Sequence, residues 1–300
     1  MTYLSPLRYP GGKGLLLRFV RHLVQRNAHP GATYVEPFAG GAAIALGLLR
    51  SGEVDHGIIG DTDPAISAFW KAALQYPDEF AALVRECRVT IDTWHEQTHA
   101  LHHTEMADTV TLGFAAFFLN RTNHSGILRA RPIGGLNQTG PYKLDCRFNR
   151  SDLLERLRRV AQLADRITVY SGDAIDLLEL LAPRYAHDAF VYADPPYLTK
   201  STDLYVNTMT YEKHQQLADT LTTQFRQWIV SYDCDPRVAD ELYPHHGILR
   251  FGLRHSAGRA HRGSEFMAFS PHVNPDSAAH LLRSASWVRR HRTEETALPR

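Results

Sequence analysis

The chain has 300 residues, of which 44% are hydrophobic and 22% charged, and its formal net charge is +1. This composition excludes a disordered or low-complexity chain and gives no global signal for nucleic-acid binding. The longest apolar run, residues 110–119, is far shorter than the roughly 20 residues of a membrane span, so no membrane partner is expected. The three cysteines, Cys87, Cys146 and Cys234, lack metal-ligand spacing. They predict a reducing cytoplasm, with neither a disulfide framework nor a metal site.

The first 75 residues predict the opening of a doubly wound α/β domain. A short strand at 33–35 leads into the turn 36–41 (EPFAGG), and a strong helix-forming segment follows at 42–50. Glycines let a ligand approach the backbone, and the start of a helix offers free N–H groups, so this pattern is typical of a nucleotide cradle. The turn lacks the G-x-G-x-x-G order, and no Gly-Lys-Ser/Thr follows it. A nucleoside ligand without a polyphosphate is therefore expected.

An acidic residue stands where such a cradle needs one. The strand expected at 57–60 ends at Asp61, which lies 61 − 41 = 20 residues after Gly41. At this spacing an acid at the tip of the second strand reaches the two hydroxyls of a ribose. Glycines that merely pack closely would explain the turn alone, but not the turn, helix, strand and acid together.

A second motif follows the apolar strand expected at 189–193. Asp194, Pro195, Pro196 and Tyr197 come directly after it. Two prolines remove two N–H donors and fix φ, so the strand must end in a rigid turn at the carboxyl edge of the sheet. There the Asp194 carboxylate and the Pro195 carbonyl could each accept one N–H of an exocyclic amino group, with Tyr197 stacked on the ring that carries it. An ordinary acidic strand end is the alternative.

Two segments are markedly basic. Residues 121–150 carry six basic residues against the single acid Asp145, in a stretch rich in Gly, Asn, Thr and Pro: Arg121, Arg129, Arg131, Lys143, Arg147 and Arg150. A second cluster comprises Arg250, Arg254, Arg259 and Arg262. A solvated charged surface is one explanation. Long loops inside compact chains are usually functional, which favours a surface that contacts phosphates.

With these motifs placed, the chain resembles the Dam-type family of S-adenosylmethionine-dependent DNA adenine-N6 methyltransferases over about residues 4–270. Residues 8–13 (RYPGGK) resemble the N-terminal cofactor motif, 36–41 the cofactor loop, and 194–197 the catalytic motif. Asp173 matches an acid near the adenine of the cofactor. The resemblance implies S-adenosylmethionine as cofactor, bound by Tyr9, Lys13, Glu36, Pro37, Phe38, Gly40, Gly41, Asp61, Asp173 and Asp194, with Asp194, Pro195, Pro196 and Tyr197 as the catalytic residues.

The resemblance also implies double-stranded DNA as the partner. Residues 117–126 resemble the start of the DNA-contacting hairpin loop of the family, and the expected DNA-binding residues are Arg121, Asn123, Arg129, Arg131, Lys143, Arg254 and Arg259. Arg129 aligns with a base-reading position, although a phosphate contact or a structural role stays open. Residues 122–124 and 129–132 depart from the best-known members, so a GATC target cannot be inherited. Ala42 replaces a usual glycine, which is expected to narrow the cradle only slightly.

The expected fold is a Rossmann-like methyltransferase sheet with helices on both faces. Residues 1–75 and 151–275 would form this catalytic domain, 76–150 an inserted, mainly helical recognition domain with a basic hairpin loop, and 276–300 a polar tail. Helices are expected at 78–88, 94–103, 107–120, 175–181 and 211–225, with another helix capped by Ser151. Further strands are expected at 167–170, 228–231 and 265–269.

The expected activity is methylation of N6 of a flipped adenine within a specific short duplex DNA sequence, in the cytoplasm. Three rivals stay open: a methyltransferase for protein glutamine, one for RNA adenine, and a DNA-binding protein with a vestigial site. The glutamine enzymes typically have Asn in place of Asp194. The sequence also leaves open whether the protein acts alone, beside a restriction nuclease, or within a phage or anti-phage system.

Overall fold

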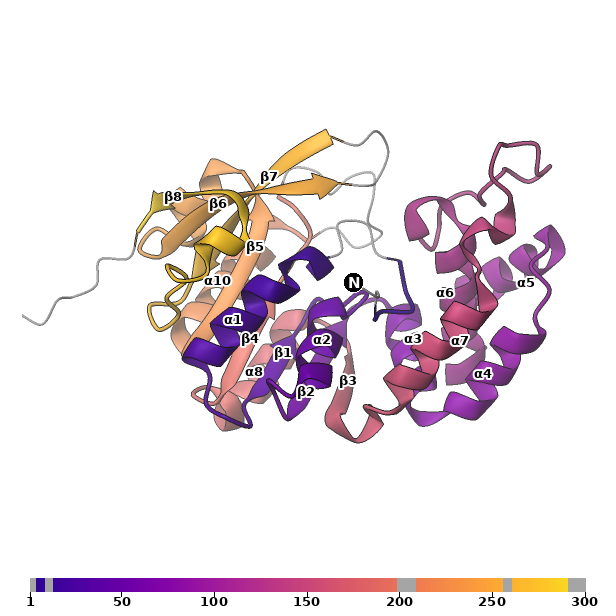
Figure 1. The fold of residues 1–300 in the computed structure, drawn as a ribbon, viewed down its shortest axis with the longest axis horizontal. Coiled ribbons are helices and arrows are strands. Elements are labelled where there is room, and N and C mark those ends of the chain that lie inside the picture. Colours follow the sequence, from indigo (N-terminus) through magenta and orange to yellow (C-terminus); the bar gives the residue numbers. More distant parts are fainter. Residues whose placement is uncertain (1–3, 9–12, 199–208, 256–260, 291–300) are drawn as a thin grey trace, which may run out of the picture.

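A computed structural model describes residues 4–8, 13–198, 209–255 and 261–290, and Figure 1 shows its ribbon. The described strands form one eight-stranded sheet in the order β3-β2-β1-β4-β5-β7-β6-β8. The five parallel strands are β1 (Thr33–Glu36), β2 (His56–Asp61), β3 (Ile167–Ser171), β4 (Ala189–Ala193) and β5 (Gln227–Asp233). The antiparallel strands are β6 (Gly247–His255), β7 (His261–Phe269) and β8 (Arg283–Arg289). A doubly wound α/β fold is thereby confirmed.

Both faces of the sheet are covered, which explains why its central strands are apolar throughout. In β4, Phe190 and Tyr192 join one hydrophobic cluster while Val191 joins the other, because successive side chains of a strand point to opposite faces. The first face is covered by α1 (Leu17–Asn27), α2 (Ala43–Ser51) and α3 (Pro64–Gln75). The second is covered by α8 (Ala174–Tyr185), α10 (Tyr211–Gln224) and the single turn η5 (Val238–Leu242).

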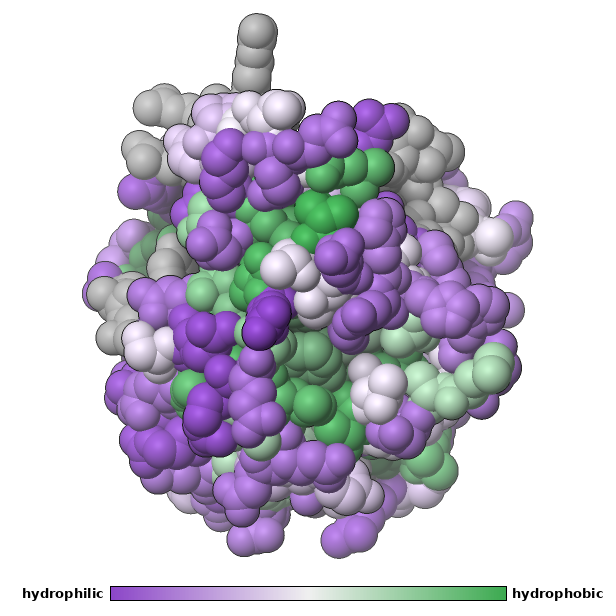
Figure 2. Space-filling view, turned by 90° about the vertical axis from the view of Figure 1, so that its right-hand side faces the viewer, coloured by the Kyte–Doolittle hydropathy of each residue, from purple (hydrophilic) through white to green (hydrophobic). Residues whose placement is uncertain are grey.

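A block of helices extends the first layer beyond the sheet. It contains α4 (Pro77–Glu86), α5 (Ile91–His102), α6 (Thr109–Thr122) and α7 (Arg150–Ala161). The helix α6 lies at its centre, packed against α3, α4 and α5, and is buried on nearly every side. Figure 2 shows the outer side of the block, where apolar residues gather in a band between polar ones. Because α3 and α7 also pack against these helices, the helical layer begins before residue 76 and ends after residue 150.

Most elements expected from the sequence are present within a few residues of their predicted bounds, but two expectations differ from the structure and one strand was missed. Asn149, not Ser151, caps α7, since the Asn149 side chain accepts from the Asp152 N–H. The strand β6 was not foreseen, because its alternation is interrupted by arginines. The polar tail expected after residue 275 instead contains the turn η6 (Ala279–Leu281) and β8, whose backbone pairs with β6. Exposed edge strands are polar on both sides, so composition alone does not distinguish them from a tail.

The strand order brings the acids of the sequence to one edge. β1 and β4 are neighbours whose connections run in opposite directions, and ligands of open α/β sheets bind at the carboxyl ends of such a pair. Glu36 and Asp61 end β1 and β2, and Asp194 follows β4. Because β7 is antiparallel to β5, its central residue Glu265 lies opposite Asp233, the last residue of β5. No helix among the described residues is long and apolar enough to span a bilayer.

The contact between α3 and α6 gives a test of the helical block. A Cβ atom built on Gly113 would lie 2.7 Å from the Ala68 carbonyl oxygen and 3.0 Å from the Ala72 Cβ. Helix propensity alone predicts that Gly113→Ala stabilises the protein by about 1 kcal/mol. Because a backbone atom cannot move aside cheaply, we expect a loss of about 1–3 kcal/mol in the free energy of unfolding.

Chemical denaturation of this variant decides between the two signs. The matched control is Gly14→Ala, where the added Cβ meets only an ordinary contact of 3.6 Å with the Ala43 Cβ. That control should leave the stability nearly unchanged. A stabilised Gly113→Ala protein would show that α3 and α6 do not approach as closely as described.

Candidate active site

A buried lysine joins two carboxylates at the carboxyl edge of the sheet. Lys13 begins the short helix η1 (Lys13–Leu16), and its side chain is 6% exposed. Its Nζ lies 2.9 Å from Asp194 Oδ1 and 3.2 Å from Glu265 Oε1. Burial alone would lower the pKa of Lys13, but the two carboxylates outweigh it and the pKa is raised. Lys13 is therefore a permanent cation that ties the N-terminal segment to β4 and β7.

Within the described part of the chain, only one oxygen of Asp194 accepts hydrogen bonds. Oδ1 accepts from Lys13 and from the Ser231 hydroxyl at 2.6 Å, and the Tyr192 hydroxyl lies 2.9 Å from the Ser231 oxygen. No described residue donates to Oδ2, and this oxygen is not sealed from solvent. The fixed Oδ1 thus leaves Oδ2 as a positioned, open hydrogen-bond acceptor.

The turn after Asp194 is held from the neighbouring strands. The Tyr197 hydroxyl donates to Glu265 Oε1, and the Lys13 Nζ lies 5.6 Å from the centre of the Tyr197 ring. The Leu198 N–H donates to Asp233 Oδ1 at 3.2 Å. Pro195 is buried and Pro196 half-buried, and no described residue donates to the Pro195 carbonyl. The Pro195 carbonyl, next to Asp194 in the chain, is therefore also left without a donor among the described residues.

Glu265 was missed by the sequence analysis, although the structure makes it central. Glu265 is 1% exposed, and its Oε1 accepts hydrogen bonds from Lys13 Nζ and from the Tyr197 hydroxyl. Its Oε2 has no hydrogen-bond partner among the described residues. Burial raises the pKa of Glu265, while Lys13 acts in the opposite direction. The available signal was a charged residue opening an otherwise apolar strand (EFMAF). Ser231 was missed too, because a serine inside a strand is not distinctive.

The residues expected to form the cofactor cradle lie at the ends of β1 and β2. The Gly40 N–H donates to Asp61 Oδ2 at 3.0 Å, and the Asp63 N–H donates to Asp61 Oδ1 at 2.9 Å. Glu36 Oε2 accepts from the Ala45 N–H at 3.1 Å, in the first turn of α2. Burial raises the pKa of Asp61 to about 7 and that of Glu36 to about 8.

The backbone of the cradle departs from the sequence expectation at one residue. Ala42 precedes α2 with φ of 44°, a left-handed conformation that costs an alanine about 1–2 kcal/mol. The expectation that Ala42 only narrows the cradle slightly is therefore incomplete, since its backbone is also strained. Pro37 is buried and Phe38 half-buried against the cluster formed with α8 and α10. Gly41, which precedes Ala42 in the chain, is also buried.

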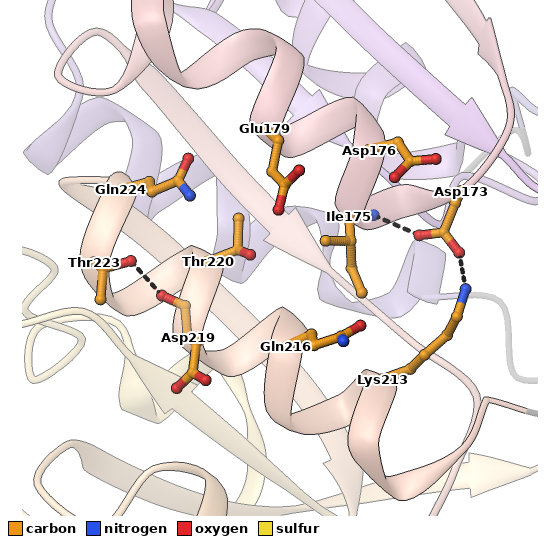
Figure 3. Close-up of a pocket in the computed structure, with 10 residues that line it drawn as sticks. All are labelled: Asp173, Ile175, Asp176, Glu179, Lys213, Gln216, Asp219, Thr220, Thr223 and Gln224. Atoms are coloured by element: carbon orange, nitrogen blue, oxygen red, sulfur yellow. Dashed lines mark hydrogen bonds and ion pairs between the residues drawn. The ribbon is translucent and has the colours of Figure 1, made fainter.

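Asp173 lies farther along the same edge. It caps α8 by accepting from the Ile175 N–H at 2.8 Å, and it pairs with Lys213 from the first turn of α10. Burial raises the pKa of Asp173, but the bonds from Lys213 and the backbone outweigh it and the pKa is lowered. Figure 3 shows both residues at one end of an open hollow of about 530 Å³ between α8 and α10. Polar side chains line most of this hollow, so it does not enclose an apolar ring.

The basic segment begins with two residues that do not lie on an exposed loop. Asn123 is fully buried: its Nδ2 donates to the carbonyls of Ile127 and Leu128, and its Oδ1 accepts from Trp94 Nε1 at 2.6 Å. The prediction that Asn123 contacts DNA is therefore wrong, because its side chain is consumed in shaping the loop. Arg121 lies in the last turn of α6 and is 7% exposed, rather than standing on the loop surface.

The remaining loop residues are accessible. A single antiparallel bridge between Asn123 and Pro132 closes the base of a hairpin, and Arg129 and Arg131 are exposed between them. Lys143 is exposed too, and its Nζ donates to the Gln138 carbonyl at 2.6 Å. The backbone of Arg254 belongs to β6. Tyr9 and Arg259 lie outside the described residues.

Buried Glu36 leads to a prediction about stability and pH. Its pKa is about 8 in the folded protein against 4.5 ordinarily, so between these values the folded chain holds a proton that the unfolded chain releases. Stability should therefore fall as the pH rises through this window. Glu36→Gln mimics the protonated form, and its free energy of unfolding relative to the parent should rise by about 1–3 kcal/mol between pH 5 and pH 8.5.

Urea denaturation at a series of pH values measures this difference. Glu86→Gln removes an exposed acid at the end of α4 and serves as the control, with no comparable trend. A constant offset between Glu36→Gln and the parent would contradict the raised pKa.

Comparisons with known proteins agree with the geometry. A family model described as D12 class N6 adenine-specific DNA methyltransferase matches residues 9–256. The Type II methyltransferase M.MjaIII of Methanocaldococcus jannaschii is 25% identical over 204 residues, which cover 64% of this chain and 68% of that protein.

Two solved structures are similar in a weaker sense. A putative RNA methyltransferase, PH1948 from Pyrococcus horikoshii, is 10% identical with a TM-score of 0.41, over 88% of this chain and 84% of that one. The rRNA methyltransferase AviRa from Streptomyces viridochromogenes is 14% identical with a TM-score of 0.40, over 88% of each chain. Overlaps this low support no inference about substrate.

The family match spans most of the chain, including the cradle and the residues around Asp194. It confirms the resemblance, the enzyme class, the methyl donor and the DNA substrate expected from the sequence. The chain belongs to the D12 class N6 adenine-specific DNA methyltransferases, which transfer a methyl group from S-adenosylmethionine to adenine in DNA.

Proposed function

We propose that the site around Asp194 methylates a flipped adenine within one specific short duplex sequence. The observation that carries this assignment is the pair of open acceptors after β4, Asp194 Oδ2 and the Pro195 carbonyl, beside an Asp194 Oδ1 that Lys13 and Ser231 hold in place. An adenine amino group has two N–H donors on one nitrogen, which matches two adjacent acceptors. A duplex hides this nitrogen, so the base must leave the stack at a cost of a few kcal/mol.

The chemistry follows from what these acceptors do to the amino group. The lone pair of N6 is delocalised into the adenine ring, which makes the nitrogen a poor nucleophile. Two accepted hydrogen bonds favour a tetrahedral nitrogen and direct its lone pair out of the ring plane. When bound, S-adenosylmethionine would supply the electrophilic methyl group: a bond from N6 to the methyl carbon would form as the methyl–sulfur bond breaks, with S-adenosylhomocysteine as the leaving group. The residues of the site would contribute positioning and electrostatics, and the surplus N6 proton would pass to water after the transfer.

Lys13 and Glu265 keep the acceptors in place. Lys13 occupies Asp194 Oδ1, which leaves Oδ2 as the oxygen that meets the adenine. Glu265 fixes the opposite side of Lys13 and the hydroxyl of Tyr197, whose ring we propose as the stacking surface for the flipped base. Glu265 thus acts as a positioning residue that sets the relative places of the acceptor and the ring.

The cradle residues fit S-adenosylmethionine. Asp61 stands at the tip of β2, where it can accept from ribose hydroxyls in addition to the backbone groups of Gly40 and Asp63. The turn that contains Pro37, Phe38, Gly40 and Gly41 would receive the nucleoside. Asp173 would approach the adenine amino group, and Tyr9, Lys13, Glu36 and Asp194 would serve the methionine part.

The DNA-binding part is proposed from charge and exposure. Arg129, Arg131 and Lys143 are exposed on the hairpin region that follows α6. Together with Arg254 and Arg259, these residues would contact the duplex, and residues 76–150 would form the recognition domain. Arg129 is the candidate base reader among them. An RNA substrate would use the same chemistry, and a vestigial DNA-binding role would use the same surface. We place the enzyme in the cytoplasm, acting alone or beside a cognate restriction or defence protein.

Methyl transfer from labelled S-adenosylmethionine to unmethylated genomic DNA tests the assignment. The parent protein should yield N6-methyladenine at one short motif, detected by modification-sensitive sequencing. Asp194→Ala should lose turnover by a factor on the order of 1000 or more, because it removes the positioned acceptor. Transfer to RNA but not DNA would favour the RNA alternative, and cofactor binding without transfer to either would favour a binding-only role.

The raised pKa of Asp61 predicts how nucleoside affinity depends on pH. Only the ionised carboxylate accepts from both ribose hydroxyls, so affinity should rise as the pH increases through about 7 and then level off. The suitable probe is 5′-deoxy-5′-methylthioadenosine, which lacks the titrating amino and carboxyl groups of the methionine part.

Calorimetry with this probe should give Asp61→Asn a weaker affinity, by about tenfold or more, and a flat pH profile. Glu36→Gln removes the other cradle acid whose pKa is raised, and it should keep the midpoint near pH 7. If Asp61→Asn retained the pH dependence, Asp61 would not be the ribose acid.

The positioning role of Glu265 has a kinetic signature. Glu265→Ala frees both Lys13 and Tyr197, and the single-turnover rate of methylation should fall by a factor on the order of 100. Glu265→Gln keeps an acceptor for both donors and should recover part of that loss. The rate is compared at saturating cofactor and DNA, with melting curves to confirm folding. Equal rates for Glu265→Ala and the parent would contradict the role.

A further inference from the structure

Four arginines meet at the base of the hairpin region, where the N-terminal segment crosses the helical block. This arginine cluster consists of Arg8, Arg121 at the end of α6, Arg147 at the end of the turn η3 (Leu144–Arg147), and Arg156 in α7. Arg121 and Arg147 belong to the basic segment 121–150 of the sequence. None of the four belongs to the site around Asp194.

Hydrogen bonds draw the four segments together. The Asn120 side chain accepts from the Arg8 N–H at 2.7 Å and donates to the Arg8 carbonyl at 2.6 Å. The Arg121 Nε donates to the Arg147 carbonyl at 3.0 Å. The Arg156 Nη1 donates to the Ser5 carbonyl at 3.1 Å, three residues before Arg8. The cluster is therefore built by specific contacts between distant parts of the chain.

The positive charge of the cluster is poorly compensated. Asp152 pairs with Arg156 at 2.7 Å and is the largest opposing influence on Arg121. Burial lowers the pKa of Arg121 to about 9, and the charges of Arg156, Arg8 and Arg147 add to this effect. Burial and the charge of Arg147 lower the pKa of Arg8 as well. Like charges held together away from water are costly unless an anion joins them.

Donors in the cluster are left without acceptors. Arg121 is 7% exposed, and its two terminal nitrogens donate to no described residue, although they are not sealed from solvent. The Arg156 Nε is sealed from solvent and has no hydrogen-bond partner among the described residues. Arg147 is exposed at the rim, and its side chain makes no described hydrogen bond. The cluster thus has guanidinium donors without described acceptors, with Arg121 buried and Arg147 exposed at the rim.

We propose that the arginine cluster binds one backbone phosphate of the DNA substrate. A phosphate offers several acceptor oxygens and the negative charge that the cluster lacks, and the planar fork of a guanidinium matches it in a bidentate manner. The exposed Arg129, Arg131 and Lys143 lie on the segment between Arg121 and Arg147, so the cluster stands at the foot of the surface assigned to DNA. This inference rests on the proposed function in taking that surface as the one that meets the duplex.

Duplex binding at several salt concentrations tests the phosphate contact. Arg147→Gln and Arg121→Gln should each weaken affinity by about tenfold, equally for all sequences, and reduce the slope of log K against log salt by about one unit. Arg158→Gln is the matched control, because Arg158 is exposed on α7 two residues from Arg156 and pairs with Glu155. Arg147→Gln changes an exposed side chain and keeps the test valid if Arg121→Gln folds poorly. Affinity and slopes equal to the parent in both variants would overturn the proposal.

Thermal melting separates a DNA phosphate from a free anion and from a purely structural cluster. Without ligand, Arg121→Gln should melt no lower than the parent, since it removes a repelled charge. If inorganic phosphate raises the melting temperature of the parent while DNA affinity is unchanged in the variants, the site serves a free anion and the proposal fails. Methyl transfer by the parent protein is measured in parallel, so that failure of the phosphate site is distinguished from failure of the proposed function.

Discussion

The ion pairs of Lys13 with Asp194 and Glu265 are the interaction on which the site depends. They join the N-terminal segment to the end of β4 and to the middle of β7, the strands that flank β5 in the sheet. Burying two carboxylates without a cation would be strongly unfavourable. With Lys13 in place, one oxygen of Asp194 is fixed and the other is left open. The substrate positioning that we propose for Asp194 would therefore follow from how a buried charge is balanced.

The sheet order makes this arrangement possible. Parallel strands bring their carboxyl ends to one edge, where Glu36, Asp61 and Asp194 end or follow neighbouring strands. The antiparallel β7 lies beside β5, and its central residue Glu265 lies opposite the last residue of β5 at the same edge. The nucleoside cradle and the amino-group acceptors that we propose would thus lie at one edge of the sheet. The strained Ala42 backbone lies in the same cradle, as expected where a ligand approaches closely.

Charge is unevenly distributed between the two halves of the molecule. The sheet edge concentrates carboxylates, while the junction with the helical block concentrates arginines, and the whole chain has a formal charge of only +1. A near-neutral protein can therefore carry a local surface for a polyanion. The unpaired donors of Arg121 and Arg156 lie where the N-terminal segment, α6 and α7 converge. Arg8, in the cluster that we propose for a DNA phosphate, comes five residues before Lys13, which we propose for the cofactor.

The sequence by itself determined the chemistry, because the Asp-Pro-Pro-Tyr turn, the glycine turn and the acid 20 residues later are local patterns whose geometry is set by the backbone. It also located most helices and the parallel strands, since their hydrophobic periods are local too. Tertiary structure alone decided which side chains meet across the chain. Glu265 lies in the site because β7 pairs antiparallel with β5. Asn123 is not available on the surface proposed for DNA, because its side chain bonds with Trp94 and with two backbone carbonyls. β8 became an edge strand through its pairing with β6. Such contacts depend on partners far away in the chain, and a local pattern cannot specify them.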